Sequence, residues 1–229
     1  MNLLALETST EYLSLALLVD GKTLSFEANA GQTHSQLILP QIQVLLSAAN
    51  LQLIDLDGLA FGAGPGSFTG VRIAAGVAQG LGFGASLPVA GICTLLALAE
   101  ESGACKVISC LDARMGEVYH AAYEKIEMQW HAVIAPGLYK PEAVPALPGA
   151  DWIGVGSGWQ AYAPQLNAIY SGQLQDVEGT LLPTASAILR LALPRFASGE
   201  ALPASAALPI YIRNRVALKT AERELGMRL

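Results

Sequence analysis

The sequence predicts an α/β fold in which a strand hairpin followed by helices occurs twice. Short apolar runs separated by turn residues alternate with segments whose apolar residues recur every three or four positions, the spacing of a helix. Of the 229 residues, 52% are hydrophobic and 14% charged, enough apolar material for a sizeable core. A second hairpin starts near residue 105. We therefore predict a first lobe over residues 1–104, with residues 208–229 packing on it, and a smaller second lobe over residues 105–207.

The chain opens as an antiparallel meander. Asp20-Gly21 separates two apolar runs and predicts a type I′ turn, which needs two residues with positive φ. The strands it implies cover residues 3–6, 12–19 and 23–28.

A helix is predicted over residues 34–49. Thr33 followed by Gln36 has the form of a capping box at its start. Pro40 removes one backbone hydrogen bond, so we expect a kink there or a start near residue 39. The apolar stripe consists of Leu37, Ile38, Ile42, Leu45 and Ala49.

A glycine-rich loop over residues 62–70 leads from a short strand into a second helix, residues 71–84. Gly76, Gly80 and Gly84 recur every four residues on one face of this helix. Glycine inside a helix costs about 1 kcal/mol relative to alanine. Their repetition therefore predicts close approach by another helix, which either this chain or a second subunit supplies.

The remaining elements follow the same alternation. Pro194 should interrupt the last helix. The expected strands are residues 89–91, 106–112, 117–123 and 152–156, and the expected helices are residues 94–102, 157–166 and 183–199.

Charge is distributed unevenly along the chain. Residues 1–105 hold eight acids and two bases, and the net charge is −6. Direct RNA capture needs clustered cations, so tRNA contact is predicted only for Arg213, Arg215 and Lys219; a solvated C-terminal helix is the alternative.

The N-terminus lacks a basic region before its apolar run, and the three cysteines form no C-x-x-C pair. These features predict a cytoplasmic protein that binds no membrane.

Two loops have the composition of phosphate-binding loops. One consists of Thr8, Ser9 and Thr10, and the other contains Gly64, Gly66 and Ser67 before a helix N-terminus. Neither contains the lysine of a P-loop, so tight turns remain an alternative. The three histidines are scattered and predict no metal site. We identify no catalytic constellation, and Asp112 is interpreted as part of a structural turn or, alternatively, as an acid/base group.

Six segments together resemble the TsaB (YeaZ) family of tRNA modification proteins. The most specific are Gly-Pro-Gly-Ser-Phe-Thr-Gly-Val-Arg over residues 64–72 and Asp-Ala-Arg-Met-Gly-Glu-Val-Tyr over residues 112–119. The resembling segments span residues 4–10, 33–36, 60–73, 112–119, 155–162 and 209–214. The resemblance implies two ribonuclease H-like lobes of the actin/sugar-kinase/Hsp70 ATPase type, with the second lobe reduced.

The same resemblance implies a non-catalytic subunit. Such a protein pairs with TsaD, which forms threonylcarbamoyladenosine at position 37 of tRNA; TsaE joins them, and tRNA is reached indirectly through the complex. No metal or resident cofactor is implied, apart from a nucleotide at the TsaD interface. The first two helices would pair with TsaD, or with a second copy as a homodimer. Carried over to this sequence, the interface residues are His34, Leu37, Ile38, Gln41, Ile42, Leu45, Arg72, Ala75, Gly76, Gln79, Gly80 and Phe83.

The sequence departs from the family pattern at two positions. Glu7 stands where the family commonly has aspartate, and Ala63 where arginine is frequent. Both departures weaken a phosphate-site interpretation. Two alternatives remain: an ATP-binding phosphotransferase or ATPase of the actin-like fold, and a peptidase.

Overall fold

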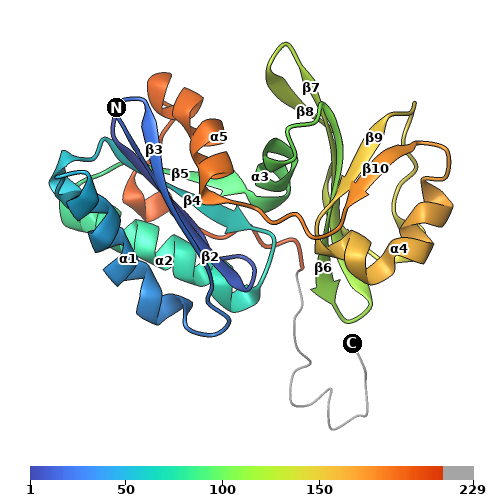
Figure 1. The fold of residues 1–229 in the computed structure, drawn as a ribbon, viewed down its shortest axis with the longest axis horizontal. Helices are drawn as coiled ribbons and strands as arrows, with labels where there is room; N and C mark the ends of the chain where they lie inside the picture. The colour runs from blue at the N-terminus through green and yellow to red at the C-terminus, as the bar shows by residue number, and fades with distance from the viewer. Residues whose placement is uncertain (214–229) are drawn as a thin grey trace, which may run out of the picture.

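The chain forms two five-stranded sheets that lie side by side, with helices on both faces of each (Figure 1). The structure is a computed structural model and describes residues 1–213. The N-terminal sheet has the strand order β3-β2-β1-β4-β5, and the second has the order β10-β9-β6-β7-β8. This is the two-lobed α/β fold that the sequence predicts.

The first sheet combines a hairpin with parallel strands. β1 pairs antiparallel with β2 and parallel with β4, and β4 pairs parallel with β5. Asp20 and Gly21 between β2 and β3 have φ values of 50° and 75°, which confirms the turn that needs two positive φ angles. The strands are β1 (Leu3–Glu7), β2 (Tyr12–Val19), β3 (Lys22–Asn29), β4 (Gly58–Gly64) and β5 (Val89–Cys93).

Three helices cover this sheet. α1 (His34–Ala48) and α2 (Phe68–Ala85) pack on one face, and α5 (Ala185–Ala197) packs on the other. The predicted capping box of α1 is wrong, because the Thr33 hydroxyl donates to the Ala30 carbonyl oxygen instead of capping the helix. Pro40 lies inside α1, which begins at His34 rather than near residue 39.

The second sheet contains two strands that the sequence prediction missed. These are β8 (Gln129–Tyr139) and β10 (Leu174–Glu178), both edge strands with few buried side chains and therefore no apolar alternation. α4 (Ser157–Ile169) packs on one face of the sheet and α3 (Thr94–Glu101) on the other. The remaining strands are β6 (Lys106–Arg114), β7 (Glu117–Ile126) and β9 (Trp152–Val155).

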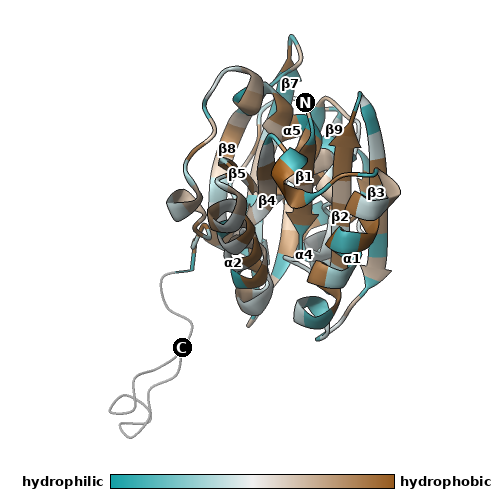
Figure 2. Ribbon diagram, turned by 90° about the vertical axis from the view of Figure 1, so that its left-hand side faces the viewer, coloured by the Kyte–Doolittle hydropathy of each residue, from teal (hydrophilic) through white to brown (hydrophobic). Residues whose placement is uncertain are grey.

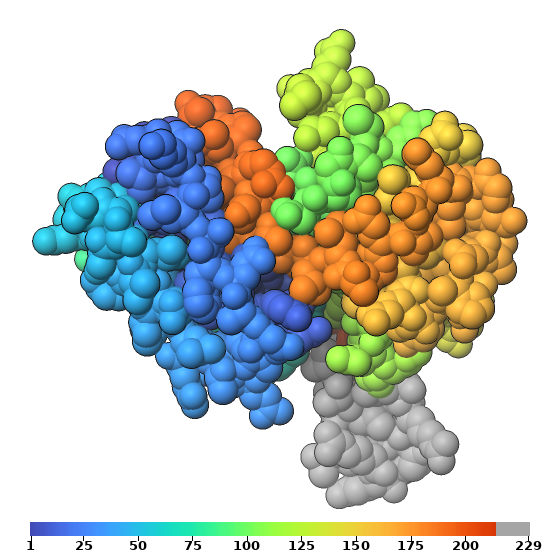
Figure 3. All heavy atoms as spheres, viewed as in Figure 1, coloured from blue at the N-terminus to red at the C-terminus, as the bar shows by residue number. Residues whose placement is uncertain are grey.

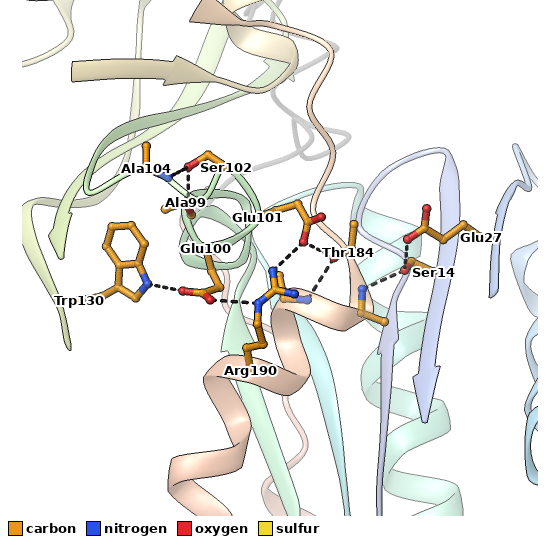
Figure 4. Close-up of polar contacts among 12 residues, drawn as sticks. Ser14, Glu27, Ala99, Glu100, Glu101, Ser102, Ala104, Trp130, Thr184 and Arg190 are labelled. Carbon is orange, nitrogen blue, oxygen red and sulfur yellow. Dashed lines mark hydrogen bonds and ion pairs between the residues drawn. The ribbon is translucent and has the colours of Figure 1, made fainter. Parts of the chain in front are cut away.

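α3 joins the two lobes. Leu95 and Leu98 are buried against the second sheet, whereas Ala97 is buried with α5 and the first sheet. The Glu100 carboxylate accepts hydrogen bonds from Trp130 and Arg190 (Figure 4). It also accepts one from Lys125, so one side chain of α3 links β7, β8 and α5. Above α3 the lobes separate, leaving a notch between α5 and the β7–β8 hairpin (Figure 3).

The sequence prediction placed residues 183–207 in the second lobe, but the structure places much of this segment against the first. α5 contacts β1, β2, β4 and β5, and Ala204 and Ala207 are buried beside α2. The physical reason is that α5 supplies the apolar cover for the face of the first sheet opposite α1 and α2. The apolar pattern of a helix does not specify which sheet it covers.

Candidate functional site

The outer face of α2 is almost free of charge and exposes three glycines. We use "α2 face" for Arg72, Gly76, Gly80, Phe83 and Gly84, which are all exposed. In Figure 2 this helix is brown and pale with little teal. A Cβ built on Gly76, Gly80 or Gly84 would meet no atom of the described residues within 4 Å. Packing within the described chain therefore does not explain these glycines, although together they cost about 3 kcal/mol of helix stability.

Other glycines of α2 serve the interior of the chain. A Cβ on Gly70 would overlap the Thr8 carbonyl oxygen, and one on Gly82 would lie 2.8 Å from the Ala204 Cβ. These two glycines allow the loop after β1 and the residues after α5 to approach the helix backbone closely.

A matched pair of substitutions tests this division. We expect Gly70→Ala to lower the free energy of unfolding by roughly 1–3 kcal/mol, because the methyl group would displace the backbone of Thr8. Gly76→Ala should instead raise it by about 1 kcal/mol, because the new methyl group enters open space and alanine favours the helix. Urea denaturation of the two variants measures both effects. If both variants changed the free energy of unfolding equally and in the same direction, the assignment of Gly70 to the interior and of Gly76 to the open face would be contradicted.

The predicted interface residues divide into two groups. His34, Ile38, Ile42, Leu45 and Ala75 are buried within the chain, so the prediction that they line a partner surface needs correction. Four of them belong to the first-lobe core, and the His34 imidazole lies 3.1 Å from the Tyr12 carbonyl oxygen. The apolar stripe of α1 that the sequence pattern revealed is the face that packs against the first sheet.

The second group remains accessible. Arg72, Gly76, Gly80 and Phe83 are exposed, with Phe83 63% exposed, and Leu37, Gln41 and Gln79 are partly buried. On α1 the exposed apolar side chains are Leu39 and Val44, which the sequence-based prediction did not include. Leu39 and Val44 lie outside the main apolar stripe of α1, and this position in the sequence pattern could have indicated that they are exposed.

The two candidate phosphate loops bind one another. The Thr8 hydroxyl donates to the Gly70 carbonyl oxygen over 2.7 Å, and the Ser67 amide donates to the Ser9 carbonyl oxygen over 2.8 Å. Thr8, Ser9 and Gly64 are buried, Thr10 and Gly66 are partly buried, and Ser67 is exposed. The hydroxyls of Thr8, Thr10 and Ser67 each have a hydrogen-bond partner within the fold, whereas the buried Ser9 hydroxyl has none among the described residues.

Glu7 lies beside these loops, and its buried carboxyl group is only partly hydrogen-bonded. Its side chain is 1% exposed, and it lies over Gly62, where a Cβ would overlap the carboxylate. One carboxylate oxygen accepts the Ser9 amide hydrogen, and the other has no partner among the described residues. Burial raises the pKa of Glu7 to about 7, although hydrogen bonds from Ser9 and Thr8 oppose the increase.

A shallow groove of about 610 Å³ lies at the boundary of the two lobes, and it is acidic. Glu27 of β3, Glu101 of α3 and Glu178 of β10 line it, together with residues 179–182 and Thr184. No lysine or arginine is among the described residues that line it. A phosphate in this groove would face carboxylates.

The predicted tRNA contacts are only partly described. The Arg213 side chain is 10% exposed and pairs with Glu117 over 2.7 Å, so its guanidinium group is engaged within the chain rather than presented to RNA. This corrects the prediction for Arg213. Arg215 and Lys219 lie outside the described residues.

Other candidate groups have structural surroundings. Asp112 accepts hydrogen bonds from Arg114 and Tyr162, as in a structural turn. Cys93 is partly buried, Cys110 is buried and Cys105 is exposed. Within residues 1–213 no three His, Cys, Asp or Glu side chains are placed to share a metal ion. Nor does this part of the chain contain a helix of the length and apolarity needed to cross a membrane.

Comparison with known proteins identifies the family. A family model described as "TsaD: tRNA N6-adenosine threonylcarbamoyltransferase" matches residues 28–195. The tRNA threonylcarbamoyladenosine biosynthesis protein TsaB of Escherichia coli (strain K12) is 42% identical over 228 residues, covering 96% of this chain and 97% of the relative. This chain belongs to the TsaB family.

Solved structures agree with the TsaB assignment. YeaZ from Pseudomonas aeruginosa is 40% identical, with a TM-score of 0.85, and the alignment covers 92% of this chain and 99% of that one. A second Pseudomonas aeruginosa structure, described as an uncharacterized protein with similarity to peptidase YEAZ, is 40% identical, with a TM-score of 0.86 and coverage of 93% and 99%. The two-lobed fold is therefore a property of TsaB relatives along nearly the whole chain.

Proposed function

We propose that this chain is a non-catalytic subunit that pairs with TsaD through the α2 face and supports threonylcarbamoyl transfer to adenosine 37 of tRNA. In this proposal TsaE joins the pair, a nucleotide lies at the TsaD interface, and tRNA is reached through the complex. Without TsaD, two copies of the chain pair through the same face. The observation that carries the proposal is the open space over Gly76, Gly80 and Gly84.

The α2 face has the properties of an interface core. Arg72 is the only charged residue of α2, and Phe83 extends from the same face as the three glycines. Interface cores are poor in charge and rich in aromatic residues, and small residues allow two helix backbones to approach closely. Leu39 and Val44 add exposed apolar area on the neighbouring helix α1.

The interior of the first lobe supports a non-catalytic role. The loops that would hold phosphate bind one another, and the Glu7 carboxyl lies buried beside them. The groove at the lobe boundary is lined by three carboxylates, of which Glu101 pairs with Arg190. The other two, Glu27 and Glu178, would repel a nucleotide triphosphate.

Reconstitution tests the proposal. TsaD and this chain should co-purify, and threonylcarbamoylation of tRNA by TsaD should require the chain. TsaD that is fully active without the chain, or that forms no complex with it, would overturn the proposal. Calorimetry with ATP and Mg²⁺ on the isolated chain addresses the ATPase alternative, for which micromolar binding with turnover is the distinguishing result.

A further inference from the structure

Residues 207–213 cross from the first lobe to the second after the last helix. Ala207 is 3% exposed within the first-lobe core, and the Ile210 amide donates to the Ala63 carbonyl oxygen over 2.7 Å. The Tyr211 ring lies 6.5 Å from the Phe68 ring, and the Arg72 guanidinium lies 4.8 Å from the Tyr211 ring centroid. The segment is thus attached to β4 and to the start of α2.

Three residues after Ile210, Arg213 binds the second lobe. One of its terminal nitrogens lies 2.7 Å from a Glu117 carboxylate oxygen and 3.1 Å from the Ala113 carbonyl oxygen, and the other lies 3.2 Å from the Met115 sulfur. These partners surround the turn between β6 and β7. Figure 1 shows the segment passing between the sheets toward β6.

The turn that Arg213 binds has an uncommon backbone. Arg114, Met115 and Gly116 have φ values of 62°, 59° and 73°, a left-handed conformation that non-glycine residues seldom adopt. Such residues persist where their surroundings hold them in place. The guanidinium group supplies hydrogen bonds to this turn, together with a charge pair at the first residue of β7.

The two lobes are therefore attached at opposite ends of one hairpin. β6 and β7 pair from Lys106–Glu124 at the open end to Arg114–Glu117 at the turn. Glu100 of α3 binds Lys125 near the open end, and Arg213 binds Glu117 at the turn. The nine residues of β6 span roughly 26 Å from end to end. Rotation of the second lobe about α3 would consequently move the turn by several ångströms.

The crossing segment has little slack to follow such a movement. The three residues from Ile210 to Arg213 span at most about 10 Å when extended. A large displacement of the turn would break either the Ile210–Ala63 hydrogen bond or the Arg213–Glu117 pair. We propose that residues 207–213 form an interlobe clasp, in which Arg213 and Glu117 fix the angle between the two sheets while α3 acts as the hinge. This proposal concerns the isolated chain and does not depend on pairing with TsaD.

Distance measurements between the lobes test the clasp. Spin labels at Ser47 of α1 and Gln165 of α4 report the angle between the lobes, with Cys93 and Cys105 replaced by serine. With the labelled chain diluted in unlabelled chain, so that only distances within one copy are measured, we expect one narrow distance distribution in the parent, and a distribution about twice as broad in Arg213→Gln and in Glu117→Gln. Arg114→Gln is the matched control, because the Arg114 side chain is 85% exposed and pairs with Asp112 in the same turn.

Hydrogen exchange distinguishes a clasp from a local contact. Loss of the clasp should accelerate amide exchange about tenfold both in residues 113–118 and in residues 207–211, which lie on different lobes. Unchanged distance distributions in a folded Arg213→Gln variant, or faster exchange in residues 113–118 alone, would overturn the proposal. If Arg213→Gln does not fold, Glu117→Gln provides the same test from the second lobe.

Discussion

Replacing Gly76 and Gly80 together with alanine should stabilise the isolated chain by about 2 kcal/mol and weaken its pairing with TsaD by about a hundredfold. The stability gain follows from the open space over both positions and the higher helix propensity of alanine. The affinity loss follows because two methyl groups would separate helix backbones that approach closely at an interface. The substitutions thus act in opposite directions on folding and on association.

A bulkier side chain on the α2 face should block association while leaving the folding of the chain intact. Gly80→Leu is expected to fold as a monomer and to abolish both the TsaD complex and the homodimer in size-exclusion chromatography. Ala161→Leu places the same side chain on an exposed position of α4 and serves as the control. The free energy of unfolding is measured by urea denaturation at a protein concentration at which the parent is monomeric. An intact complex with Gly80→Leu would refute the assignment of the α2 face.

Glu7→Gln should change how the stability of the chain depends on pH. The pKa of Glu7 is about 7 in the folded chain, against 4.5 as its ordinary value. Because the folded pKa is higher, the stabilising contribution is complete below pH 4.5 and is lost as the pH rises through 7. Each pKa unit corresponds to about 1.4 kcal/mol, so the loss amounts to roughly 3–4 kcal/mol. Glutamine has the same shape without the charge, and the variant should exceed the parent in stability by about this amount at pH 8 and equal it near pH 4.5.

The contribution of His120 to stability has the opposite pH dependence, and it partly cancels that of Glu7 in the free energy of unfolding of the parent. Burial lowers the pKa of His120 to about 4, so the folded chain loses stability as the pH falls from 6.5 to 4. The parent should therefore vary little in stability between pH 4.5 and 7. Denaturant unfolding of the parent, Glu7→Gln and His120→Gln across this range separates the two groups. A difference between parent and Glu7→Gln that is independent of pH would contradict the role assigned to the Glu7 carboxyl.

The sequence by itself determined the features that arise locally. Asp20-Gly21 specifies its turn through positive φ angles that few other residue pairs accept, and the apolar stripe of α1 specifies its buried face. The spacing of Gly76, Gly80 and Gly84 likewise predicts a close approach to α2. The edge strands β8 and β10 could not be predicted, because their side chains are mostly exposed and carry no alternation.

Only the tertiary structure decided which surface each pattern serves. Periodicity identifies the face of a helix but not its partner, so the interface expected at Ile38, Ile42 and Leu45 proved to be core, while the open face lies at Gly76, Gly80 and Phe83. For the same reason α5 covers the first sheet rather than the second. Arg213 was predicted from its charge alone to contact RNA, yet Glu117, 96 positions earlier in the sequence, pairs with it. Contacts between residues so distant in the chain leave no periodic signal, and long-range packing therefore decides them.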